Sequence, residues 1–102
     1  MPPESNPPQI DALIHEPARL RVLALLASVE EADFMFILRS TGLSRGNLSV
    51  QMTKLENAGL VTLNRRLDGS RARTCYRLST AGTDALRTYK KTVRQLLDAL
   101  PD

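Results

Sequence analysis

Small polar and basic side chains gather on one side of a predicted helix that begins at Arg45, in the stretch TGLSRGNLSVQMTKLENAGLV from Thr41 to Val61. The helical spacing of Leu48, Met52 and Leu55 predicts the buried side. The other side presents Arg45, Gly46, Asn47, Ser49, Val50, Thr53, Lys54 and Asn57. A helix that enters the major groove of B-DNA needs such a narrow, hydrogen-bonding face with few acids. The alternative, an ordinary surface helix, more commonly carries Glu, Lys and Gln.

Each side chain on this face has a DNA partner of matching chemistry. Arg45 suits a guanine edge or a phosphate, Asn47 an adenine edge, and Val50 a thymine methyl group. Hydroxyl groups suit phosphates or bases, and the helix N-terminus, capped by Ser44, favours a phosphate. The predicted contact residues are therefore Ser44, Arg45, Gly46, Asn47, Ser49, Val50, Thr53 and Lys54.

A basic hairpin is predicted directly after this helix, which stops at Gly59. The segments LVTLNRR and ARTCYRL have strand composition and flank LDGS, whose Asp68-Gly69 pair is a strong turn signal. Arginines at a loop tip can follow a DNA backbone or enter a narrow minor groove, although edge strands also carry cations to prevent aggregation. Following a helix-turn-helix pattern, the hairpin is interpreted as a wing, with DNA contacts from Arg65, Arg66, Arg71 and Arg73.

The distribution of charge along the chain favours a polyanionic partner. The net charge of the 102 residues is only +3, but residues 39–77 carry eight basic and two acidic side chains, whereas residues 1–38 carry two and six. A basic block beside an acidic one indicates a polarised surface suited to nucleic acid, and a solvated charged face is the alternative.

Composition narrows the class of protein further. The chain is long enough for one domain, and we expect a flexible proline-rich arm at residues 1–9, a folded domain at 10–98 and a tail at 99–102. It has neither a transmembrane run nor a signal peptide, so we expect a cytoplasmic protein without membrane contact. The single Cys75 is expected to be a buried structural thiol.

Four helices and the hairpin are expected in the folded domain. A short turn at Ile10 to His15 precedes a helix that Pro17 begins, and the apolar residues of that helix surround much of its circumference. Such a helix is central in one subunit or lies at an oligomer interface. Asp33 caps a second helix over about 34–40, which Gly42 ends. The Arg45 helix is the third.

The last predicted helix has an apolar seam suited to a second copy of the chain. Ser79 or Thr80 caps this helix, which runs for about 18 residues to the neighbourhood of Asp98. Its apolar residues follow a 3, 4, 3, 4 spacing that favours a helical partner, although some of them could pack on the chain's own core. The predicted homodimer contacts are Leu86, Tyr89, Val93, Leu96, Leu97 and Leu100.

The segments TGLSRGNLSVQMTKLENAGLV and NRRLDGSRARTCYRLSTAG resemble the winged-helix DNA-binding domain of short MarR- and ArsR-like transcriptional regulators. The likeness covers about residues 10–97, and Ser79 stands where the family usually has Thr. It implies a mainly α winged helix-turn-helix with a small β-hairpin, DNA contact through the third helix and wing, and dimerisation through the first and last helices. We expect a homodimeric transcriptional regulator, a repressor, that binds a pseudo-palindromic double-stranded DNA operator.

Other functions have less support in the sequence. With His15 as the only histidine and no catalytic motif, we expect no enzyme, and with one cysteine we expect no metal site and no cofactor. A winged helix used only for protein interaction remains an alternative, as does a regulator with a small-molecule effector in its dimer cleft.

Overall fold

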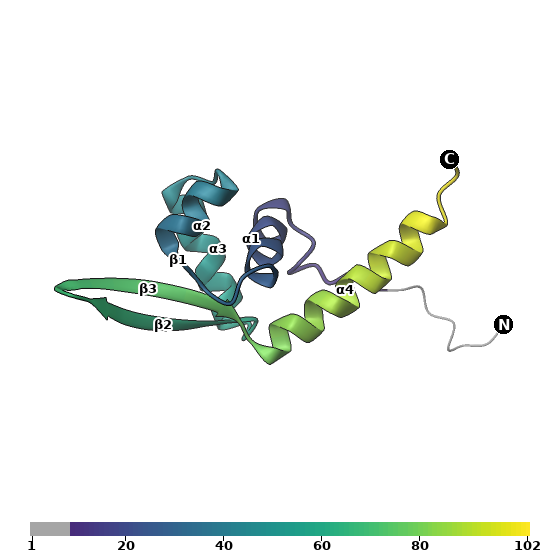
Figure 1. Cartoon of the computed structure of the whole chain (residues 1–102). Coiled ribbons are helices and arrows are strands. Elements are labelled where there is room, and N and C mark those ends of the chain that lie inside the picture. The colour runs from purple at the N-terminus through teal and green to yellow at the C-terminus, as the bar shows by residue number, and fades with distance from the viewer. Residues whose placement is uncertain (1–8) are drawn as a thin grey trace.

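The computed structural model describes residues 9–102, and within them four helices and three strands follow one another along the chain (Figure 1). The predicted arm falls almost wholly on residues 1–8, outside this range. The predicted turn at Ile10 to His15 is present, since the His15 N–H donates to the Asp11 carbonyl at 2.8 Å. The elements are α1 Pro17–Ala27, β1 Ala32–Asp33, α2 Phe34–Thr41, α3 Arg45–Asn57, β2 Val61–Asp68, β3 Arg71–Leu78 and α4 Thr80–Asp98.

The predicted helix caps are confirmed. The side chains of Asp33, Ser44 and Ser79 each accept a backbone N–H three residues on, which satisfies a donor that the helix itself cannot pair. Gly42 ends α2 in the left-handed conformation, at φ 71°. Pro17 opens α1 as predicted, with Glu16 as its cap.

The sheet has three strands instead of the predicted two. The short β1 pairs antiparallel with β3, which lies between β1 and β2. A two-residue strand is too short to show a periodicity, so no pattern in the sequence indicates it. The hairpin turn is also shifted by one residue, because Asp68 pairs with Arg71 and leaves Gly69 and Ser70 as the turn.

The core lies between the first three helices and the base of the sheet. Leu48, Met52 and Leu55 of α3 are buried as predicted, and so is the Cys75 thiol. Gln51 is the one buried polar residue among residues 9–102. In this range, none of the helices combines the length and apolar character needed to cross a bilayer.

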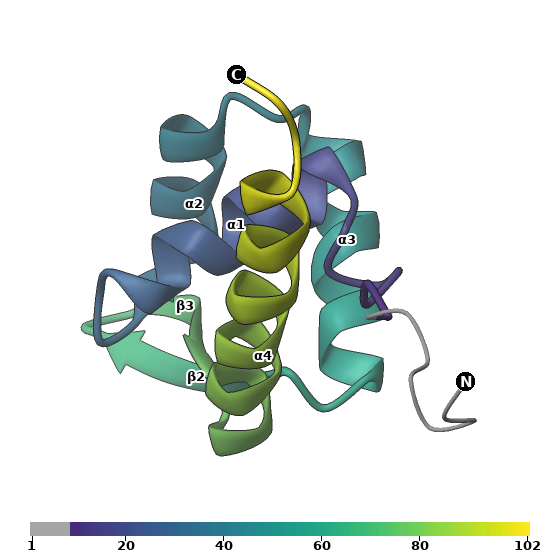
Figure 2. The same cartoon turned by 90° about the vertical axis from the view of Figure 1, so that its right-hand side faces the viewer.

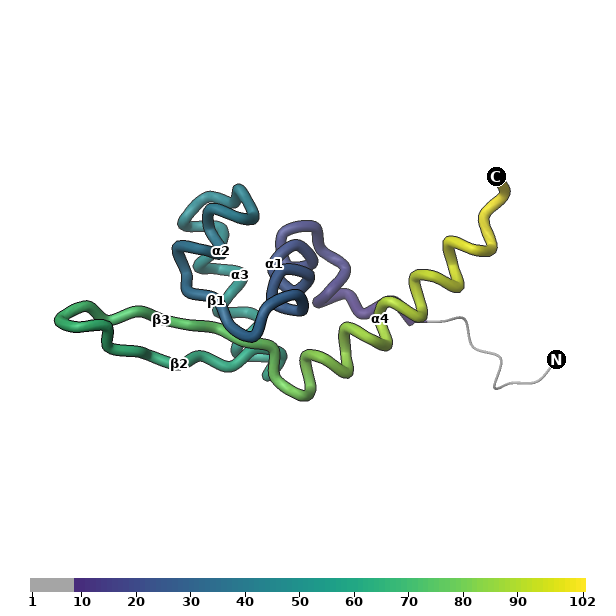
Figure 3. Tube along the Cα trace, in the orientation of Figure 1, coloured from purple at the N-terminus to yellow at the C-terminus, as the bar shows by residue number. Residues whose placement is uncertain are grey.

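The wing and α4 extend from opposite ends of the body (Figures 1 and 3). Figure 2 shows α4 crossing in front of α1. The radius of gyration is 16.1 Å, against about 13 Å for a compact domain of this length. The chain is therefore elongated, with its two projections pointing away from each other.

A close backbone contact holds the start of α4 against the turn that follows α3. The Ser79 N–H donates to the Leu60 carbonyl at 3.0 Å, and the Ser79 hydroxyl donates to the Gly59 carbonyl at 2.6 Å. Gly82 lies so near that a Cβ atom on it would stand 2.0 Å from the Leu60 carbonyl oxygen. Only glycine fits there without a backbone shift.

We therefore expect Gly82→Ala to lower the free energy of unfolding by about 1–3 kcal/mol, as overpacking does elsewhere. Gly46→Ala is the matched control, since a Cβ at Gly46 meets nothing within 4 Å. Gly46 lies in the first turn of α3, where that change should be neutral or stabilise by up to about 1 kcal/mol. Urea unfolding followed by circular dichroism measures both, and equal stability of the two variants would contradict the close contact.

Candidate nucleic-acid interface

The polar face of α3 is open to solvent along its whole length. All eight residues predicted for this part of the interface, from Ser44 to Lys54, are exposed. The Thr53 hydroxyl donates to the Ser49 carbonyl at 3.0 Å, which leaves its oxygen free to accept. Val50, half exposed at 50%, is the apolar group on this face.

The N-terminus of α3 is suited to an anion. The Ser44 hydroxyl oxygen accepts the Asn47 N–H at 3.1 Å, so this side chain acts as the helix cap. The N–H groups of Arg45 and Gly46 belong to the first turn and have no acceptor within the helix. Together with the helix dipole they favour a phosphate at this end.

An open groove of about 600 Å³ lies between α2 and the wing and reaches Arg45, the first residue of α3. Arg45 from α3 and Arg71 and Arg73 from the wing line this groove, and Arg39 of α2 adds a fourth arginine. The acids Asp33 and Asp68 also reach it. The fold therefore brings together basic residues of the two segments that the sequence assigned to DNA contact.

Two of the four predicted wing arginines are engaged in ion pairs with the segment before α2. Arg66 binds both carboxylate oxygens of Glu31, and Arg73 lies 3.3 Å from Asp33. Arg66 and Arg73 are directly opposite each other in the β2–β3 register, so their side chains share one face. All four wing arginines remain exposed, but these two are partly neutralised.

Arg65 and Arg71 have different surroundings on the wing. Arg65 pairs in register with Thr74, on the face opposite to Arg66. Arg71 faces Asp68 at the tip, next to Leu67, whose side chain is 82% exposed. The tip thus combines a cation with an uncovered apolar group.

The Tyr76 side chain at the base of the wing does not add charge to this surface. Burial, and secondly the negative charge of Glu56, raise the pKa of the Tyr76 phenol above its ordinary value. The neutral phenol is favoured in the folded chain, so the stability it contributes is present below the unfolded pKa and is lost as the pH rises through the folded pKa.

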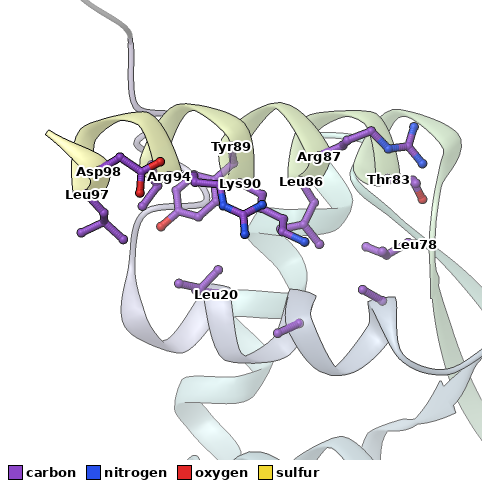
Figure 4. Close-up of a pocket in the computed structure, with 13 residues that line it drawn as sticks. Leu20, Leu78, Thr83, Leu86, Arg87, Tyr89, Lys90, Arg94, Leu97 and Asp98 are labelled. Atoms are coloured by element: carbon purple, nitrogen blue, oxygen red, sulfur yellow. The ribbon is translucent and has the colours of Figure 1, made fainter.

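A second groove, of about 840 Å³, separates α1 from α4 (Figure 4). Leu20 of α1 faces Leu86 and Tyr89 of α4 across it, while Lys90 and Arg94 provide charge along the α4 side. Four of the six predicted dimer residues line this groove: Leu86, Tyr89, Val93 and Leu97.

The predicted seam on α4 divides into two parts. Tyr89 is buried in its own chain, and its hydroxyl lies 2.8 Å from Nδ1 of His15. Leu86 and Val93 are half-buried against the same core. Leu96, Leu97 and Leu100 are 37%, 60% and 62% exposed, so the C-terminal part of the seam is the part left uncovered.

Two residues that support the polar face, Arg19 and Gln51, were not predicted from the sequence. Gln51 lies on the buried side of α3 and donates to Oδ1 of Asn47 at 2.8 Å, while its own carbonyl oxygen accepts from Arg19 of α1 at 2.8 Å. A signal was available, since Gln51 is three residues after Leu48 and four before Leu55, where a core residue is expected.

Comparison with known proteins identifies the family. Residues 18–97 match the model of a winged helix DNA-binding domain. An uncharacterised protein of Methanocaldococcus jannaschii is 30% identical over 78 residues, which are 76% of this chain and 85% of that protein. The chain therefore belongs to the winged-helix DNA-binding family, whose regulators are not enzymes.

Solved structures agree with this assignment. A transcriptional regulator homologue from Pyrococcus horikoshii superposes with a TM-score of 0.82 at 24% identity, over 88% of this chain and 89% of that one. The repressor CouR, bound to a 23-mer DNA duplex, gives a TM-score of 0.68 at 28% identity, over 76% of this chain and 54% of CouR. Other neighbours of the same fold are a MarR-family regulator at 16% identity and a PadR-family regulator at 25% identity, which confirms the fold that the resemblance to MarR-like proteins implied.

The ion pair between Arg66 and Glu31 leads to a test of the wing. Glu31→Gln should release Arg66 and raise affinity for duplex DNA, with a salt dependence steeper by about one phosphate contact per chain. Stability should change by less than about 1 kcal/mol, because the pair is at the surface. Fluorescence anisotropy at several salt concentrations measures the slope.

Asp84→Asn on α4 is the control for this experiment, since it removes the same charge at a distance from the wing. It should leave the slope unchanged. If Glu31→Gln and Asp84→Asn give the same salt dependence of DNA affinity, Arg66 does not contact phosphate.

Proposed function

We propose that this winged-helix chain is a homodimeric transcriptional repressor that binds a pseudo-palindromic operator and occludes a promoter. Recognition of bases is assigned to the α3 face from Ser44 to Lys54. Contact with the flanking backbone or minor groove is assigned to Arg65, Arg66, Arg71 and Arg73 of the wing.

The observation that carries DNA recognition is the groove beside the wing, where Arg45, the first residue of α3, meets two wing arginines. Arg45 stands at the N-terminus of α3, where the dipole and free N–H groups attract phosphate, and Arg71 and Arg73 reach the same groove. Phosphate contacts of this kind fix the position of a recognition helix, and base-edge contacts then supply specificity. Asn47 and Val50, which are assigned to base edges, follow Arg45 on the exposed face of α3.

The dimer is supported by the uncovered end of α4. Leu96 and Leu97 in its last turn and Leu100, two residues after its end, remain exposed, although the helix is otherwise rich in charge. They continue the apolar lining of the α1–α4 groove through Leu97. A second copy placed there by a two-fold axis would cover both surfaces and pair two recognition helices with two half-sites.

Two other functions compete with this proposal. A protein-interaction module without DNA contact would be favoured by acids on α3 or the wing, where only Glu56 and Asp68 are found. An effector-responsive regulator is favoured by the α1–α4 groove, whose apolar lining and rim of Lys90 and Arg94 suit a small molecule with an apolar body. The dimer cleft of the proposed repressor would then include that ligand site.

Direct binding to duplex DNA tests the repressor proposal. With about three phosphate contacts per subunit, affinity should fall on the order of a thousandfold between about 50 and 200 mM salt. Asn47→Ala should weaken the preferred site by about 1–3 kcal/mol and leave random DNA nearly unchanged. Arg71→Ala should weaken all duplexes more evenly. Absence of duplex binding at low salt, in a folded sample, would exclude the proposal.

Sedimentation equilibrium tests the dimer separately. Leu97→Asp combined with Leu100→Asp should produce a folded monomer, because each leucine loses roughly 1.5–3 kcal/mol of burial and the new charges cannot be solvated in an interface. Thr88→Asp combined with Gln95→Asp adds the same charge on the opposite face of α4 and should leave the dimer intact. A wild-type protein that sediments as a monomer at tens of micromolar would contradict the proposed dimer.

A further inference from the structure

A chain of three side chains connects α1 to the DNA-facing surface of α3. Arg19 of α1 donates through Nη1 to Oε1 of Gln51 at 2.8 Å. Gln51 donates through Nε2 to Oδ1 of Asn47 at 2.8 Å. Gln51 is 7% exposed, whereas Asn47 is exposed at the interface. These two hydrogen bonds therefore connect the half-buried guanidinium of Arg19, through Gln51 at the edge of the core, to Asn47, which is proposed to contact a base.

The hydrogen-bond donors and acceptors of these three side chains can be matched in only one way. A guanidinium group can donate but cannot accept, so it must face the carbonyl oxygen of the Gln51 amide. The NH₂ group of Gln51 is then the end that faces Asn47, and it requires the Asn47 carbonyl oxygen as its acceptor. Reversing either amide would set two donors or two acceptors against each other.

The Arg19 guanidinium is itself held in place. Its Nε donates to the Leu13 carbonyl, and the Arg19 backbone N–H donates to the Glu16 carboxylate at 2.8 Å as part of the α1 cap. Because a guanidinium group carries donors only, the order that it imposes on the two amides has no alternative.

We infer that Arg19 and Gln51 are positioning residues that turn the NH₂ group of Asn47 toward DNA and so select guanine at the base that Asn47 contacts. An unrestrained asparagine reads adenine with both ends of its amide, using N6 as donor and N7 as acceptor. Here the Asn47 oxygen is directed inward to Gln51, and the outward group is a donor. Guanine presents two adjacent acceptors in the major groove, O6 and N7, whereas adenine and thymine present one each and cytosine presents only a donor, so an outward donor favours guanine.

This inference rests on the proposed function and replaces the adenine contact that the sequence suggested for Asn47. It also gives a reason for a polar residue on the buried side of α3. Every described buried side-chain N and O atom has a hydrogen-bond partner, so both ends of the Gln51 amide are satisfied. Its burial limits the alternative orientations open to the Asn47 amide.

Gln51→Glu tests the inference because it reverses the order with almost no change in shape. Both oxygens of the introduced carboxylate accept, so Asn47 must turn its NH₂ group inward to donate and expose its oxygen instead. Selection of bound sequences from random duplex DNA should then show guanine replaced by adenine or cytosine at one position. That position is identified as the one whose preference Asn47→Ala abolishes. The relative preference should change by roughly 5- to 150-fold, the range of a base-edge contact.

Arg19→Met keeps most of the side-chain bulk and removes the donors, so it provides a second test if the Gln51→Glu variant does not fold. Both amide orientations become available, and adenine should rise toward the level of guanine. Arg21→Met, an equal loss of charge on the exposed side of α1, is the control and should keep the wild-type motif.

The outcomes separate the two proposals. A wild-type protein that enriches no motif would overturn the proposed function and this inference with it. A wild-type motif that persists unchanged in Gln51→Glu, or in Arg19→Met if the first variant is unfolded, would overturn the inference alone.

Discussion

The packing of Gly82 against the Leu60 carbonyl fixes the directions in which the functional segments leave the body. Leu60 lies between the end of α3 and the start of β2, and Gly82 is in the first turn of α4, directly after β3. Hydrogen bonds from Ser79 to Gly59 and Leu60 hold the same junction. The end of α3, both strands of the wing and α4 therefore meet at one place, and their relative orientation depends on a contact that admits no side chain.

Electrostatics at the interface depend on tertiary pairing more than on the charge of each segment. The acids of residues 30–33 belong to the acidic N-terminal block in the sequence, but the pairing of β1 with β3 brings Asp33, and Glu30 and Glu31 just before β1, to the edge of the sheet beside the wing. There they pair with Arg66, Arg73 and Arg77. Among residues 9–102, the positive charge of this surface that has no ion-pair partner therefore lies toward the wing tip and the start of α3, which a duplex reaching across both would meet.

Much of this arrangement was predictable from local signals. Caps at Asp33, Ser44 and Ser79 and the stop at Gly42 depend on residues within a few positions of one another, so the helices could be located closely from the sequence. β1 could not be predicted, because its two residues are defined by pairing with Tyr76 and Cys75, more than forty positions away in the chain. The contacts of Arg19 and Gln51 are also long-range, and they alter the chemistry expected of Asn47, whose exposure alone was predictable from periodicity. The assigned DNA and dimer contacts remain predictions from the sequence.

The uncovered leucines of α4 also bear on how the protein would respond to its own abundance. If a second copy is needed to cover Leu97 and Leu100, then dimer concentration rises with the square of monomer concentration while monomers predominate, as mass action requires. Occupancy of an operator that only dimers hold tightly would follow the same steep law. A twofold change in synthesis or dilution would then alter the dimer concentration up to about fourfold. Through these exposed leucines, operator occupancy would therefore depend steeply on the number of gene copies.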